Sequence, residues 1–335
     1  MAGAAEKPAA PRIVLACAAI HSRRSKAPAY GFERCWCNVP SAPTNRKPRL
    51  DLLKSAEESS SPSRRYLVFV RAGPSSLHAR LLAEDPSRNW DCAINYWHST
   101  EPPDNAAEIY CTGGVNKFDG FLEFWRSDKR SRGYQYYLLL DDDVIFEPGD
   151  VSRLFELSAR HSIALCQPAL KWTTYYNLNV TVVNAACEVR SVSFVEVMAA
   201  CFSAATLEQL LPTFSLSLST WGIDWAWACL LKGTGKLHVV DAVTIEHTKP
   251  VDVKSGALYR MLRARGVDFD GELLQARRQY GEFGAMRTLS GPHVYRSGVP
   301  RPLGFLLVRL FEVLKAFARQ RKKLARRHHR MMRAA

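Results

Sequence analysis

The sequence lacks any apolar run close to the roughly 20 residues that a membrane-spanning helix needs. The most apolar stretch near the start, residues 13–20 (IVLACAAI), follows Pro8 and Pro11 and makes only a feeble signal peptide. We expect a disordered leader or a short strand there. No internal repeat is visible, which argues against solenoid and propeller architectures.

The sequence also lacks a cysteine pattern of the kind that staples small secreted domains. It has nine cysteines, an odd number, and most of them lie inside apolar runs. Cys35 and Cys37 are too close together for the usual zinc-binding pair, and no second Cys/His pair is nearby. Buried free thiols in a reducing compartment fit this pattern better than disulfides, and we therefore expect a cytoplasmic protein.

Positive charge is abundant but unevenly distributed. The formal net charge of the 335 residues is +14, with clusters at residues 12–54 and 301–333. Such a balance favours nucleic acid, anionic lipid or phosphorylated substrates as partners. Because the basic residues gather in the tails and do not alternate with aromatic ones on a strand, nucleic acid is not the expected partner.

Composition divides the chain into three parts. Residues 1–65 are rich in Ala, Pro, Ser and basic residues, and we expect an irregular or disordered leader. Strand-like and helix-like segments alternate over residues 66–251, which predicts one α/β domain with a mostly parallel, twisted sheet flanked by helices. Residues 252–335 are predicted to form a helical extension with a basic tail.

Three aspartates interrupt an apolar run of strand length. Residues 134–140 (YQYYLLL) precede Asp141, Asp142 and Asp143, and Val144 continues with strand-forming residues. Acids at the carboxyl edge of a buried strand lie where open α/β sheets bind ligands. Two carboxylates one residue apart suit Mg²⁺ or Mn²⁺ with a diphosphate as further ligand. A turn or helix cap is the alternative, although residues 147–150 already supply one.

Three later residues extend this constellation. Asp224 follows a glycine in the turn Trp221-Gly-Ile-Asp-Trp, and His247 directly follows a predicted strand. Glu196 lies between two valines in an apolar segment, where an inward carboxylate needs a partner. Each also has a simpler explanation: Asp224 as a helix cap, His247 as a loop histidine and Glu196 as an outward-facing side chain.

The order of these motifs resembles the metal-dependent nucleotide-sugar glycosyltransferases of the GT-A fold. The blocks LVFVRAG, RNWDCAINYW, LLLDDDVIF, LCQPAL, FVEVMAACFS, WGIDW and VVDAVTIEHTKP more closely resemble the family called domain of unknown function 707. The resemblance covers residues 66–251. It implies transfer of a sugar from a nucleotide-diphosphate donor to a glycan, lipid or small-molecule acceptor, with Mn²⁺ or Mg²⁺ as cofactor.

The resemblance also implies roles for individual residues. Asp141 would face the nucleotide ribose or the metal, Asp143 would bind the metal, and His247 would be a late metal ligand. Asp224 would deprotonate the acceptor in an inverting reaction, although a retaining outcome stays open. The nucleotide base would lie against the loop of Arg71, Ala72 and Gly73.

Three further residues have less specific assignments. Lys249, like Arg71, is a candidate to neutralise the charge that develops on the departing diphosphate. Asp142 belongs to the same cofactor-binding group without a defined role. Glu196 falls where acceptor-site residues often lie in these enzymes, and we include it as a catalytic candidate.

Two rival functions remain open from sequence. An aspartyl-nucleophile phosphotransferase also begins with Asp-x-Asp after a buried strand, but its later acidic pair is missing and only Asp241 stands alone. A nucleotide-sugar binder without turnover is the second rival.

The sequence of the C-terminal segment is compatible with two interpretations. Residues 303–317 are largely apolar, and residues 319–333 are densely cationic. This order suits a helix on the anionic inner face of a membrane. It equally suits a helix docked on the domain with a solvated tail.

Overall fold

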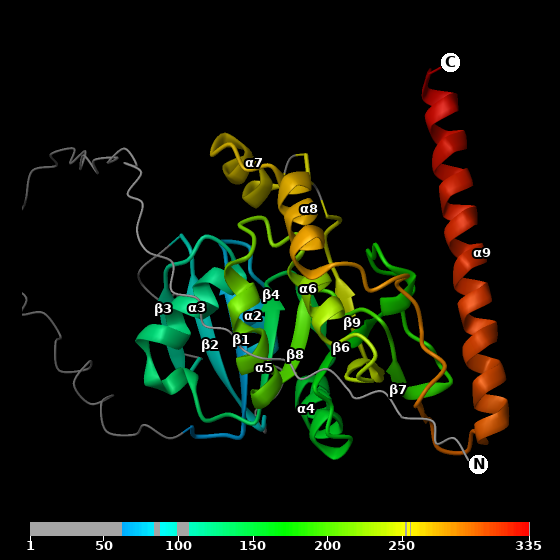
Figure 1. Cartoon of the computed structure of the whole chain (residues 1–335), viewed down its shortest axis with the longest axis horizontal. Coiled ribbons are helices and arrows are strands. Elements are labelled where there is room, and N and C mark those ends of the chain that lie inside the picture. The colour runs from blue at the N-terminus through cyan, green and yellow to red at the C-terminus, as the bar shows by residue number, and fades with distance from the viewer. Residues whose placement is uncertain (1–61, 84–87, 99–106, 252, 255, 335) are drawn as a thin grey trace, which may run out of the picture. The chain divides into compact units, whose positions relative to one another are not determined.

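The computed structural model describes residues 62–83, 88–98, 107–251, 253–254 and 256–334 (Figure 1). Almost all of the predicted leader, including the octet at 13–20, lies outside these residues and stays a prediction. Within the described ranges, no helix combines the length and apolarity required to cross a membrane.

The described chain alternates strands and helices, as the spacing of its apolar segments predicts. Its strands are β1 (Tyr66–Ala72), β2 (Trp90–Tyr96), β3 (Ile109–Thr112), β4 (Tyr136–Asp141), β5 (Val144–Phe146), β6 (Leu165–Leu170), β7 (Cys187–Ser191), β8 (Ala199–Ser203), β9 (Leu237–His247) and β10 (Val294–Tyr295). Its α-helices are α2 (His78–Ala83), α3 (Lys117–Ser127), α4 (Asp150–Arg160), α5 (Ala204–Leu210), α6 (Ile223–Leu230), α7 (Ala257–Ala264), α8 (Phe269–Tyr280) and α9 (Arg301–Ala334). Short 3-10 turns are η1 (Lys129–Ser131), η2 (Asn179–Thr181) and η3 (Leu211–Ser215).

The strands form one mixed sheet in the order β10-β7-β9-β6-β8-β4-β1-β2-β3, with β5 paired to β9 (Figure 1). Strands β1 to β4, β6, β9 and β10 run in one direction, whereas β5, β7 and β8 run in the other. The prediction of an α/β fold around a mostly parallel sheet is therefore confirmed. The carboxyl ends of β1, β4 and β9 carry Arg71 and Ala72, Asp141, and His247, respectively.

Apolar side chains cover both faces of this sheet, because alternate residues of each strand point to opposite sides. On one face, Leu67 and Leu139 belong to a core formed with helices α3, α5 and α6. On the other, Val68 and Leu138 pack with α4, and α2 contributes partly buried leucines. The result is a three-layer arrangement, with the sheet between two layers of helices.

Strand β6 contains a proline, a residue that is rare inside strands. The strand continues through Pro168 to Leu170. Its pairing with β9 shifts register between Pro168 and Ala169, which are opposite Val240 and Thr244. A proline has no N–H for the sheet, and an irregularity of this kind accommodates it.

The remaining predictions concern the thiols and the C-terminal helices. The six cysteines in the described ranges are all free, and the reducing compartment stays a prediction. The charged segment after residue 252 forms two helices, α7 and α8, separated at Gly266. Helix α8 packs on α6, where the Cβ of Ala276 would lie 2.6 Å from a side chain added at Gly222.

Candidate active site

The three aspartates turn the chain from β4 into β5. Asp141 is the last residue of β4, and Asp142 and Asp143 form the turn before Val144. We call Asp141, Asp142, Asp143, Glu196, Asp224 and His247 the carboxylate site.

Asp142 connects this turn to the loop after β1. Its carboxylate accepts a hydrogen bond from the Gly73 N–H at 2.8 Å, and its carbonyl oxygen accepts one from the Leu77 N–H at 2.8 Å. A Cβ on Gly73 would lie 2.8 Å from the Trp97 indole nitrogen, so a larger residue there would require the half-exposed Trp97 side chain to shift. Asp142, for which sequence gave no defined role, therefore positions the two loops.

Asp143 and His247 lie next to each other because β5 pairs antiparallel with the end of β9. Val144 is the register partner of His247, which places Asp143 Oδ2 3.5 Å from His247 Nε2. Burial would lower the pKa of His247, but its interaction with Asp143 raises it. Burial would likewise raise the pKa of Asp143, and His247 holds it below its usual value. The threonine Thr174 fixes the His247 backbone at both its N–H and its carbonyl.

Lys117 is a buried partner of Asp141 that sequence reasoning missed. Its Nζ lies 2.6 Å from Asp141 Oδ1 and also donates to the carbonyl oxygens of Val197 and Met198. Asn116 caps helix α3 by accepting from two backbone N–H groups, which fixes the lysine at the first helical position. The only sequence signal was a lysine directly after an N-cap asparagine.

Asp224 occupies the first turn of α6, as the Gly-Ile-Asp motif predicted. Gly222 precedes it with φ 90°, a left-handed conformation that favours glycine. Burial raises the pKa of Asp224 to about 7, against hydrogen bonds from backbone N–H groups that lower it. The carboxylate accepts one of these bonds from Trp225 N at 2.9 Å. The N-cap of α6 is Gly222, so Asp224 is an acid of the first helical turn and not the cap that sequence offered as the alternative.

The loop before this turn is organised by Glu272 of α8, a second residue that sequence reasoning missed. The Glu272 carboxylate accepts from Leu218 N at 2.9 Å and from Ser219 N at 3.0 Å. It also accepts from the hydroxyl of Ser217 at 2.9 Å. Helix α8 therefore helps to position Asp224, although it lies outside residues 66–251.

Glu196 is a buried acid of the carboxylate site. It is 9% exposed, and its Oε2 atom has no hydrogen-bond partner among the described residues. Burial, and after it the negative charge of Asp224, raises its pKa to about 7. Its backbone N–H donates to Gln167 at 2.7 Å, which holds the segment in place. Burial of a carboxyl oxygen without a hydrogen bond is energetically unfavourable, so this atom is a candidate to bind a ligand.

Aromatic side chains from three elements gather near Asp224. Trp221 Nε1 donates to the Tyr259 hydroxyl at 3.2 Å, and its ring centroid is 6.2 Å from that of Phe269. The charges of Asp141 and Asp224 contribute to the raised pKa of Tyr259, after burial. Tyr259 belongs to α7, and no sequence motif pointed to it.

In the predicted nucleotide loop, the Arg71 side chain is already engaged in hydrogen bonds within the protein. The Arg71 guanidinium donates to the carbonyl oxygens of Gly113 at 2.8 Å and Gly114 at 2.6 Å, and also to Asn95. Ala72 is fully buried, and its carbonyl oxygen accepts from the Trp97 N–H at 3.5 Å. Lys249 is exposed and donates to Ser75 at 3.3 Å, and its charge helps to lower the pKa of Asp143.

The donor set allows two protein ligands for a divalent ion. In the described part of the chain, no group of three or more His, Cys, Asp or Glu is arranged to hold a metal. Two ligands at right angles on an ion bound at about 2.1 Å would lie about 3 Å apart, close to the 3.5 Å between Asp143 and His247. Mg²⁺ sites commonly combine one or two protein ligands with substrate phosphates. Asp141 Oδ1, in contrast, is already paired with Lys117.

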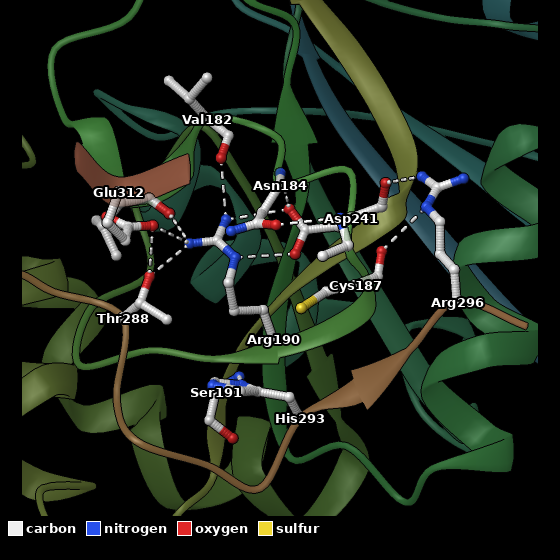
Figure 2. Close-up of polar contacts among 12 residues, drawn as sticks. Val182, Asn184, Cys187, Arg190, Ser191, Asp241, Thr288, His293, Arg296 and Glu312 are labelled. Carbon is white, nitrogen blue, oxygen red and sulfur yellow. Dashed lines mark hydrogen bonds and ion pairs between the residues drawn. The ribbon is translucent and has the colours of Figure 1, made fainter. Parts of the chain in front are cut away.

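Asp241, the one acid left for a phosphotransferase, is buried elsewhere. It is fully buried and pairs with Arg190 at 2.9 Å, and Figure 2 shows the two side chains facing each other. Thr288 and Glu312 complete a set that we call the arginine cluster. An acid committed to this cluster is not available as a second catalytic acid.

Comparisons with known proteins add little at the level of individual residues. No family model matches the chain, and no curated protein sequence is similar to it, so the resemblance to domain of unknown function 707 stays a prediction. Among solved structures, S. aureus TarS 1–349 gives a TM-score of 0.40 at 10% identity, covering 64% of this chain and 72% of that one. GalNAc-T7, solved with UDP, GalNAc and Mn²⁺, gives a TM-score of 0.40 at 10% identity, covering 62% and 49%. Similarity this low says nothing about the site residues.

Proposed function

We propose that this protein is a metal-dependent glycosyltransferase that moves a sugar from a nucleotide-diphosphate donor to an acceptor hydroxyl. One observation carries the proposal: two kinds of acid group meet at the sheet edge. Asp143, paired with His247, stays ionised, whereas Asp224 and Glu196 have pKa values of about 7. The first kind suits a cation and a diphosphate, and the second suits proton transfer.

The donor diphosphate would bind beside Asp143 and His247. These two residues would hold Mn²⁺ or Mg²⁺, which supplies positive charge to the leaving diphosphate when bound. Lys249, exposed and within hydrogen-bond distance of Ser75, would add a second positive charge. The Gly73 N–H is already used by Asp142, which keeps the β1 loop close to the aspartate turn.

Asp224 would act as the general base. In the inverting displacement, the acceptor oxygen forms a bond to the anomeric carbon as the bond from that carbon to the diphosphate breaks. The acceptor proton passes to Asp224, and the nucleoside diphosphate leaves with the bonding electron pair. A pKa near 7 allows this carboxylate to be ionised before the step and still accept a proton during it.

Glu196 and the aromatic group would bind the acceptor. The Oε2 atom of Glu196, which has no hydrogen-bond partner among the residues described, can accept a hydrogen bond from a sugar hydroxyl, and this bond would satisfy a buried group. Trp221, held by the Tyr259 hydroxyl, offers a flat apolar face next to Asp224 for a sugar ring. This assignment makes helix α7 part of the acceptor side.

A thermal-shift screen of nucleoside diphosphates with and without Mn²⁺ tests the proposal without knowledge of the acceptor. A ligand at 100 times its dissociation constant stabilises by about 2.7 kcal/mol, roughly 5–10 °C for a domain of this size. We expect one nucleoside diphosphate to produce such a shift only with the metal. Turnover of a generic aryl phosphate without nucleotide-sugar hydrolysis would instead identify a phosphotransferase.

A further inference from the structure

Helix α9 carries apolar side chains on two opposite sides, and among the described residues only one of these sides is covered. The inner side packs on β7 and η2: Val308 is 3% exposed and joins Ala186 and Cys187 in a small core. Lys315 is 1% exposed, and its Nζ donates to the Val182 carbonyl oxygen at 2.8 Å. These contacts identify the side of the helix that faces the domain.

Polar contacts lock this inner side onto the arginine cluster. Glu312 accepts from the Thr288 hydroxyl at 2.9 Å and lies 3.6 Å from the Arg190 guanidinium (Figure 2). Lys315 adds an ion pair with Glu312 at 3.0 Å. The rotation of α9 about its own axis is therefore fixed, and so is the direction of its opposite side.

The opposite side, which we call the outer face of α9, is a stripe of large apolar side chains. Their exposed fractions lie between 48% and 64%. A contiguous exposed apolar patch of this kind marks a surface that binds a partner or a membrane. Their spacing of three or four residues keeps them on one side over four turns. The members are Leu303, Leu306, Leu310, Val313, Leu314 and Phe317.

The same helix continues into a segment without a single acid. Residues 319–333 belong to α9, which ends at Ala334. They include Arg319, Arg321, Lys322, Lys323, Arg326, Arg327, Arg330 and Arg333, and no Asp or Glu. An apolar stripe followed directly by a cationic run combines the two features that bind an anionic lipid surface.

The charge of this run argues against a second copy of the chain as the occupant. Parallel pairing of two α9 helices would place their cationic segments side by side, and like charges in contact oppose association. Antiparallel pairing would lay each cationic segment against the partner's apolar stripe. An anionic lipid surface accepts both parts of the helix together.

We propose that α9 lies on an anionic lipid surface, with its outer face among the acyl chains and residues 319–333 at the headgroups. The inner side, held by Glu312 and Lys315, would stay attached to the domain and thereby bring the domain to the surface. This proposal goes beyond the transferase function, and lipid binding requires neither donor nor metal. The two proposals can therefore fail separately.

Sedimentation of the full chain with lipid vesicles tests the inference. We expect binding to vesicles of phosphatidylcholine with phosphatidylserine, little binding to phosphatidylcholine alone, and release in high salt. The triple variant Leu306→Ser, Leu310→Ser and Phe317→Ser should bind roughly tenfold more weakly or worse, because it loses the apolar area. Replacement of Arg326, Arg327 and Arg330 by Gln should weaken binding by roughly a hundredfold.

Matched controls separate these effects from general changes in surface character. Replacement of two other exposed apolar residues, Leu274 and Met286, by Ser should leave vesicle binding unchanged. Replacement of the exposed Arg260, Arg265 and Arg278 by Gln should also leave it unchanged. Equal binding of wild type and the outer-face variant would overturn the proposal. So would a wild-type oligomer that the same variant converts to monomer without any vesicle binding, because it would assign the face to a second copy.

Discussion

Strand β9 contributes a charged residue to two very different groups, the arginine cluster through Asp241 and the carboxylate site through His247. In the arginine cluster every N–H of the Arg190 guanidinium has an acceptor. The acceptors are Asp241, Thr288 and the carbonyl oxygens of Val180 and Val182. A charge satisfied in this way has no capacity left for a ligand and serves the fold.

The carboxylate site is the opposite case. Glu196 Oε2 is buried and has no hydrogen-bond partner in the part of the chain that the structure describes, and burial raises the pKa values of Asp224 and Glu196 to about 7. Burial of these carboxyl groups is unfavourable, and nearby residues hold them in place, as the Gln167 side chain does for the Glu196 backbone. Charged groups whose hydrogen bonds are all satisfied stabilise the fold, whereas buried acids with an unsatisfied oxygen or a raised pKa are candidates for catalysis.

Removal of the proposed base should have the largest effect on activity. We expect Asp224→Asn to lower sugar transfer by roughly 10²–10⁴-fold, because the amide cannot accept the acceptor proton. Donor binding, measured by the thermal shift with Mn²⁺, should stay close to wild type. Near-normal turnover in this variant would exclude Asp224 as the base.

Disruption of the arginine cluster should act on stability. Arg190→Met leaves Asp241 buried without its partner, and we expect a loss of about 3–5 kcal/mol in the free energy of unfolding. Chemical denaturation measures this value. The exposed pair Arg277–Glu282 provides the control, since Arg277→Ala should cost less than about 1 kcal/mol. Equal losses in the two variants would contradict the distinction between the two groups.

Glu196→Gln should have the smallest effect, and it should increase the free energy of unfolding, whereas Arg190→Met decreases it. The folded-state pKa of Glu196 is raised to about 7, so the stability contributed by its protonated form is complete below about pH 4 and is lost as the pH rises through 7. The glutamine variant, without metal or donor, should be more stable than wild type by on the order of 2 kcal/mol at pH 8, with little difference at pH 4. Exposed Glu208→Gln should show no such dependence.

Local patterns in the sequence predicted much of the fold. The apolar run before Asp141 predicts a buried strand ending in carboxylates, and the glycine before Asp224 predicts the turn that begins α6. These features depend on a few neighbouring residues, which the sequence displays directly. The passage of β6 through Pro168 has no such local signal, because the proline is accommodated by the register of a distant strand, β9.

Interactions between distant residues account for what the sequence could not predict. Lys117 and Asp141 are 24 residues apart, and Arg190 and Asp241 are 51 apart. Glu272 reaches the loop before Asp224 from a helix that the predicted domain boundary had excluded. No periodicity or motif links such pairs, because only the packing of the sheet and helices brings them together.

Binding of the nucleoside diphosphate selected by the thermal screen, measured by calorimetry with and without Mn²⁺, tests the central claim most directly. The wild type and Asp270→Ala, which removes an exposed acid of α8, should both bind only when Mn²⁺ is present. Asp143→Ala should lose this Mn²⁺-dependent binding. Full retention of Mn²⁺-dependent binding by Asp143→Ala would contradict the assignment of the β4–β5 turn as the donor site.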